Sequence, residues 1–169
     1  SNAGGIVGIN NKTINDCTSV LTNKLPNEND NKSYLSSIDG ISNIGGIVGL
    51  NQSGDVTNVI VLALDISNYF EDKSSIIKPL LNGADYVGGI VGNNQGGTLN
   101  TAYIKSYFVR EKGTTELLDE VVYTIKSTKN AGAITGYNDD SANVSYCYAS
   151  NIYVSGREEQ VNSKKNNNL

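Results

Sequence analysis

The sequence predicts an all-β protein, a right-handed parallel β-helix (β-solenoid) built from four repeats of about 43 residues. One heptapeptide occurs four times, as GGIVGIN, GGIVGLN, GGIVGNN and GAITGYN, starting at residues 4, 45, 88 and 132. The copies are spaced almost evenly, and a period between 20 and 50 residues is typical of solenoids and propellers. Few paired hairpin signals are visible, which favours the solenoid over a propeller with its antiparallel blades. Plentiful glycine and asparagine with only two prolines also favour turns and short strands over helices.

The third and fourth positions of the heptapeptide predict which side chains fill the core. The third is always isoleucine, and the fourth is valine in three copies and Thr135 in the last. Because neighbours in a strand face opposite sides, we expect the isoleucines to face inward and the valines and Thr135 to face outward or into a partly wet layer. These positions are Ile6, Ile47, Ile90 and Ile134, and Val7, Val48, Val91 and Thr135.

The fifth and seventh positions of the heptapeptide are always glycine and asparagine. Glycine suits a place where the chain bends or where backbones approach closely. Asparagine suits a corner, because it tolerates left-handed backbone geometry and bonds to turns, and stacked copies can also bond to one another as a ladder. These positions are Gly8, Gly49, Gly92 and Gly136, and Asn10, Asn51, Asn94 and Asn138.

A second apolar stretch follows each heptapeptide after a short polar turn of variable length. It aligns Ile14, Val56, Leu99 and Val144 in one column and, three residues later, Cys17, Val59, Ala102 and Cys147 in another. Stacked strands lie about 4.8 Å apart, so three periods separate the two cysteines by at least roughly 14 Å. A disulfide needs Cα atoms within about 7 Å. We therefore expect two free thiols that fill the role of small apolar residues.

The stretches between these units, at about 23–44, 67–87 and 111–130, each hold short apolar runs that predict at least one more strand. Each period could be two coils of about 21 residues or one coil with a large excursion, and we favour two coils. The run ELLDEVV is short enough to be a helical turn instead. Residues 1–3 look like the scar of a cleaved tag, residues 4–156 form a single solenoid domain, and residues 157–169 form a polar tail or linker. The chain is expected to be part of a longer protein.

Composition and charge argue against several classes of function. The net charge is −4 and the isoelectric point about 4.8, and no basic stripe is present, so nucleic acid and anionic membranes are poor partners. No apolar run approaches the roughly 20 residues of a spanning helix. The chain has no histidine, the commonest general base and a frequent zinc ligand.

The string GGIVGxN, followed by a polar turn and an apolar stretch, resembles the GLUG motif. The closest forms are GGIVGLNQSGDVTN and GGIVGNNQGGTLN, and SYCYASNIYVSG at 145–156 resembles the second half of that repeat. The fourth copy departs at Ala133 and Thr135. Proteins with such repeats include bacterial adhesin-like surface proteins and the non-catalytic region of IgA-cleaving metallopeptidases. The resemblance implies a parallel β-helix, a secreted or cell-surface location, a larger parent chain and no catalytic residues.

Few residues could carry chemistry. Asp55, Asp139 and Asp140 lie in turns that follow a motif asparagine, where aspartate is common for structural reasons. The first turn lies two periods from the other, roughly 10 Å at strand spacing, which barely allows a glycosidase pair. Asp139 and Asp140 with Asn138, or ENDNK at 28–32, could offer oxygens to calcium, but a calcium site needs six to eight. GGIVG lacks the lysine and serine or threonine of a phosphate-binding loop. We therefore assign no catalytic residue, cofactor or metal.

Tyrosines gather in the second strands of the last two repeats, and they are the best candidates for a binding surface. They are Tyr103, Tyr107, Tyr146, Tyr148 and Tyr153. Exposed aromatic rows bind sugars or proteins, although tyrosine is also a good strand former. We expect a non-enzymatic spacer or adhesin-type module that binds host protein or glycan through loops or this face. An accessory region of a secreted IgA-protease-like metallopeptidase, with HExxH elsewhere in the parent chain, and a glycan-active β-helix enzyme are the alternatives.

Overall fold

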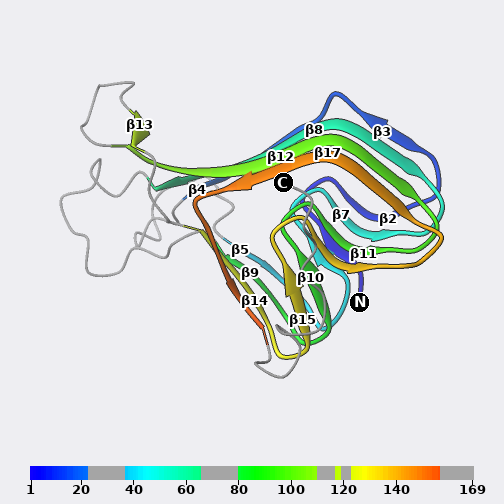
Figure 1. The fold of residues 1–169 in the computed structure, drawn as a ribbon. Coiled ribbons are helices and arrows are strands. Elements are labelled where there is room, and N and C mark those ends of the chain that lie inside the picture. The colour runs from blue at the N-terminus through cyan, green and yellow to red at the C-terminus, as the bar shows by residue number, and fades with distance from the viewer. Residues whose placement is uncertain (23–36, 66–79, 110–116, 119–122, 157–169) are drawn as a thin grey trace, which may run out of the picture.

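A computed structural model of the protein describes residues 1–22, 37–65, 80–109, 117–118 and 123–156. Within these ranges every regular element is a β-strand, and successive coils stack with their strands side by side (Figure 1). All pairings but one are parallel. The parallel β-solenoid predicted from the repeat is confirmed, and the propeller is excluded.

Each coil passes through four sheets, which we number I to IV in the order in which the chain visits them. Sheet I contains β1 (Ala3–Gly4), β6 (Ile44–Gly45), β10 (Tyr86–Gly88) and β15 (Asn130–Gly132). Sheet II contains β2 (Val7–Asn10), β7 (Val48–Asn51), β11 (Val91–Asn94) and β16 (Thr135–Asn138). Sheet III contains β3 (Thr13–Asn15), β4 (Thr18–Thr22), β8 (Asp55–Asp65), β12 (Thr98–Val109), β13 (Leu117–Leu118) and β17 (Asn143–Ser150). Sheet IV contains β5 (Ser37–Asp39), β9 (Leu80–Gly83), β14 (Tyr123–Ser127) and β18 (Ile152–Ser155).

One period of the sequence makes one coil, not two. Gly45 pairs with Gly4 on one side and with Gly88 on the other, so strands one full period apart are direct neighbours. The favoured division into two coils of about 21 residues is therefore wrong. The reason lies in sheet III, where the runs that could have supplied two short strands form the single strands β8 and β12, of 11 and 12 residues.

The stretches between the repeat units add one strand per coil to sheet IV, as predicted, through β5, β9 and β14. In the run ELLDEVV, Leu117 and Leu118 form β13, which pairs antiparallel with Phe108 and Val109 at the end of β12. The rest of that run, the polar segment at 28–32 and the tail at 157–169 lie outside the described residues.

The isoleucines of the heptapeptide enter the core, but the valines do so as well. Ile47 and Ile90 are fully buried, and so are Val48 and Val91. The outward orientation predicted for the valines is wrong, because the chain bends at residues 46–47 between β6 and β7 and strand alternation does not continue through a bend. Ile6 is 44% exposed, since the first coil has a neighbour on one side only.

The motif asparagines form a continuous ladder along the stack. Asn10 Nδ2 donates to Asn51 Oδ1 at 2.9 Å, Asn51 to Asn94 at 2.8 Å, and Asn94 to Asn138 at 2.8 Å. Asn51 also donates to the carbonyl of Gly54 in its own turn. The ladder is confirmed, but left-handed backbone geometry occurs at other positions.

The fifth-position glycines mark close contact between sheets I and II. A Cβ added at Gly49 would lie 2.6 Å from the carbonyl oxygen of Asn43 and 2.7 Å from the nitrogen of Ala3. Backbones this close leave no space for a side chain, which confirms the close backbone approach expected at these glycines.

The cysteine column has the predicted register. Ala102 pairs with Val59 and Cys147, and the carbonyl of Cys17 accepts from the Ile60 N–H, which places Cys17 beside Val59. Both cysteines are free and half-buried, with Val59 and Ala102 between them. The two thiols therefore lie at opposite ends of one packed column.

Candidate binding surface

The outer face of sheet III carries a row of partly exposed apolar and aromatic side chains. In β8, Val59, Val61 and Ala63 point inward and are buried, while Ile60, Leu62 and Leu64 alternate with them and are partly exposed. The register carries this alternation to the neighbouring strands. On the outer face Tyr103 pairs with Ile60, Lys105 with Leu62, and Tyr107 with Leu64, and in the last coil Tyr148 pairs with Tyr103.

A shallow, open hollow of 360 Å³ lies at the end of this face nearest the last coil. Its lining residues are Thr101, Ala102, Tyr103, Lys105, Tyr146 and Tyr148. Tyr146 is 85% exposed and Tyr148 is 55% exposed, so both side chains are accessible to a ligand. Mostly apolar walls with a few polar groups are typical of binding sites for small organic molecules.

The backbone kinks once in each of the four coils at the same register position of sheet III. Asp16, Asn58, Thr101 and Tyr146 occupy the same register position, and each has a positive φ of 51–56°. Aspartate and asparagine tolerate this left-handed conformation, but for a bulky residue such as tyrosine it is an outlier that costs roughly 1 kcal/mol or more. In the last two coils this position holds Thr101 and Tyr146, which do not favour the left-handed conformation, and both side chains line the hollow. Strained residues of this kind often occur at functional sites.

Lys105 occupies the outer face between two tyrosines. Its Nζ atom lies 4.7 Å from the centre of the Tyr107 ring, which is within range of a cation–π interaction. The ammonium group therefore adds positive charge to an otherwise apolar and aromatic row.

The structure brings together three of the five predicted tyrosines. Tyr103, Tyr146 and Tyr148 line the hollow, and Tyr107 lies further along the same row. Tyr153 is 59% exposed but belongs to β18 in sheet IV, so it lies on another face. The prediction missed Thr101 and Lys105, although alternation along TLNTAYIKSYFV would have placed Lys105 between Tyr103 and Tyr107.

The candidate carboxylates lie on different coils, at the separation predicted from the sequence. Asp55 begins β8 and pairs with Thr98 of the next coil, which pairs in turn with Asn143 of the last coil, so Asp55 and the Asp139–Asp140 turn are two coils apart. The Asp139 carboxylate accepts from the backbone N–H of Ser141 at 2.9 Å and from its hydroxyl at 2.8 Å, and these bonds lower the pKa of Asp139. Among the described residues no three His, Cys, Asp or Glu side chains come together as metal ligands.

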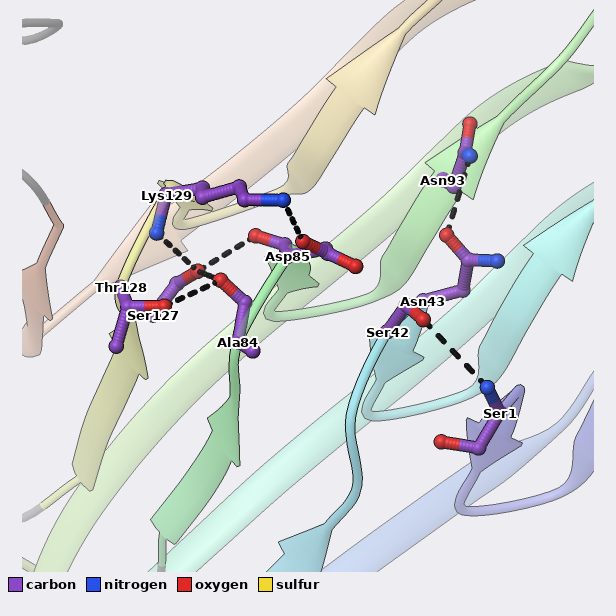
Figure 2. Close-up of polar contacts among 9 residues, drawn as sticks. All are labelled: Ser1, Ser42, Asn43, Ala84, Asp85, Asn93, Ser127, Thr128 and Lys129. Atoms are coloured by element: carbon purple, nitrogen blue, oxygen red, sulfur yellow. Dashed lines mark hydrogen bonds and ion pairs between the residues drawn. The ribbon is translucent and has the colours of Figure 1, made fainter.

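A polar corner links sheets IV and I in the last two coils (Figure 2). Lys129 Nζ lies 2.5 Å from Asp85 Oδ1, and the Ser127 hydroxyl donates to the carbonyls of Ala84 and Asp85 while Thr128 donates to Ala84. The lysine lowers the pKa of Asp85, and the aspartate raises the pKa of Lys129. These contacts run between coils, so we assign them to stacking and not to ligand binding.

None of the described residues forms a helix that could cross a membrane. No protein-family model matches the sequence, and searches of curated proteins and of solved structures give no significant match. The similarity to GLUG repeats therefore rests on the motif alone, and the outer face of sheet III is the surface from which a function is argued.

Proposed function

We propose that this chain is a non-enzymatic module of a bacterial cell-surface or secreted protein, a rigid spacer that carries an adhesin-type binding surface for glycans. The observation that carries the proposal is the exposed tyrosine hollow on sheet III, with Tyr146 in an unfavourable backbone conformation. The resemblance to GLUG repeats supports the location, and stacking of coil on coil supports the spacer role because it gives an extended, rigid surface.

The lining of the hollow favours a sugar over other ligands. The C–H face of a pyranose ring packs on an aromatic ring, and tyrosine hydroxyls can bond the ring's own hydroxyls. Tyr148 and Tyr103 lie directly opposite each other on adjacent strands, so their rings can line one side of a flat ligand.

A glycan array followed by calorimetry on the best hit tests the proposal. Tyr148→Ala and Tyr146→Ala should each weaken binding by at least about tenfold, because each removes exposed aromatic surface from the hollow. Tyr148→Phe should retain most of the affinity if stacking dominates. Tyr153→Ala is the matched control, since it removes an equally exposed ring from a different sheet.

Two results would contradict the proposal. One is the absence of binding to any neutral or acidic glycan on the array. The other is binding that survives both substitutions in the hollow or falls equally in Tyr153→Ala. Because both ring substitutions lie on the surface, circular dichroism should confirm an unchanged fold before affinities are compared.

A further inference from the structure

The second position of the heptapeptide is glycine in three copies and alanine in the fourth, and the structure explains the difference. A Cβ added at Gly5 would lie 2.3 Å from the carbonyl oxygen of Gly46 in the next coil. At Gly46 it would lie 2.2 Å from the oxygen of Gly89, and at Gly89 it would lie 2.0 Å from the oxygen of Ala133. Glycine is required at this position wherever another coil follows, because backbone oxygens cannot move aside as a flexible side chain can.

Ala133 has its methyl group at the one place in the described stack where no coil follows. Its strands β15 and β16 are the last in sheets I and II. A fifth coil placed with the spacing of the first four would bring a carbonyl oxygen against this methyl at the same short distance. The alanine is therefore compatible with the fourth coil only as the terminal coil of this stack.

Other substitutions suit the fourth coil to contact with water. Thr135 replaces the fully buried Val48 and Val91 of the middle coils and is itself only half-buried. The turn after the motif carries Asp139 and Asp140 where the two preceding turns have Gln-Ser-Gly and Gln-Gly-Gly. Charges on an edge discourage pairing with another strand, and polar outer faces are a general feature of terminal repeats.

The first coil has a charged residue, Lys12, in the turn after its motif, but its heptapeptide shows neither of the substitutions found at Ala133 and Thr135. It retains Gly5, Ile6 and Val7, the same residue types as the middle coils, although Ile6 and Ile9 are about half exposed. In the second coil Ile47, which occupies the same column as Ile6, is fully buried between neighbours on both sides. The open edge of β1, β2 and β3 thus presents the side chains of an interior coil.

We infer that the two ends of the solenoid are not equivalent: the open edge of the first coil is a docking surface for a further coil of this repeat, whereas Ala133 closes the edge of the fourth coil to such a coil. The docked coil must carry glycine at the second position of its heptapeptide, because a side chain there would meet the carbonyl oxygen of Gly5. The last coil of a second copy of this chain does not qualify, since it presents Ala133. The inference stands independently of the glycan-binding proposal.

The test adds one coil at each end of the full chain and measures urea unfolding. Residues 45–87 are inserted between Ala3 and Gly4, which keeps the register of the motif glycines. In a second chain, residues 84–127 are inserted between Gly156 and Arg157. This keeps the register, because Gly156 stands at the position of Ser127, which pairs with Gly83. The second insertion is made with Ala133 and with Ala133→Gly, and each chain is compared with the same background without an insertion, so that any effect of the substitution itself cancels.

A coil that stacks couples to its neighbour, raising the urea midpoint and the surface exposed on unfolding. We expect this for the first insertion, together with protection of the first coil's edge amides from hydrogen exchange. Gly46→Ala within the inserted coil should abolish the gain. We expect the second insertion to raise the midpoint only with Ala133→Gly. An equal gain with Ala133 present, no gain with Ala133→Gly, or no gain from the first insertion would overturn the inference.

Discussion

The asparagine ladder should be a major source of stability, and Asn51→Ala tests this. Asn51 is fully buried and makes three hydrogen bonds: it accepts from Asn10 at 2.9 Å and donates to Gly54 at 2.9 Å and to Asn94 at 2.8 Å. Alanine removes all three and leaves the Asn94 side-chain oxygen without its donor, whereas the Gly54 carbonyl still accepts from the Thr98 N–H at 3.1 Å. At about 1 kcal/mol for each of the three net hydrogen bonds and 1–3 kcal/mol for the orphaned buried group, the loss should be roughly 4–6 kcal/mol.

Two further substitutions make the comparison specific. Asn138 ends the ladder, is half-buried and makes its own donations at 3.3 Å within its own turn, so Asn138→Ala should cost only about 1–2 kcal/mol. Gln52→Ala replaces the exposed neighbour of Asn51 and should stay within about 0.5 kcal/mol of the parent. Urea unfolding followed by circular dichroism gives all three free energies. A loss below about 1 kcal/mol for Asn51→Ala, or equal losses at Asn51 and Asn138, would refute the reasoning.

Three other predictions follow from particular side chains. Tyr146→Asn should raise the free energy of unfolding by up to about 1 kcal/mol, because asparagine tolerates the left-handed conformation that Asn58 adopts in the same column, and a loss of stability in urea would contradict this. In the folded protein the pKa of Asp85 is lower than its ordinary 3.8. The stability that Asp85 contributes is therefore present above pH 3.8 and is lost as the pH falls through the folded pKa. Asp85→Asn should be less stable at neutral pH, and its stability measured by urea unfolding should fall less steeply as the pH is lowered into this range. Burial raises the pKa of Cys147, so its thiol should react with a disulfide reagent more slowly in the native than in the unfolded protein. The unfolded, unreduced protein should contain two reactive thiols, and finding none would contradict the cysteine register.

The candidate binding surface was only partly predictable. The tyrosines stood out as a cluster in the sequence, and the column that aligns Ala102 with Cys147 also aligns Tyr103 with Tyr148, but the pattern did not show that Tyr153 would belong to another sheet. The kink at Tyr146 was also hidden, because asparagine, aspartate, threonine and tyrosine share no obvious property in that column. The left-handed geometry appears only when the four strands are seen in register.

The repeat by itself determined the all-β stack, the columns that pack in it and the separation of the cysteines, because a side chain repeated at a constant period must meet its own copies in neighbouring coils. Only the tertiary structure decided that one period makes one coil, since the length of β8 and β12 depends on how far each strand pairs before it turns. It also decided that Val48 is buried and that Ala133 stands where glycine is otherwise required. Both depend on distances between backbones in adjacent sheets and coils, which the periodicity of a sequence does not record.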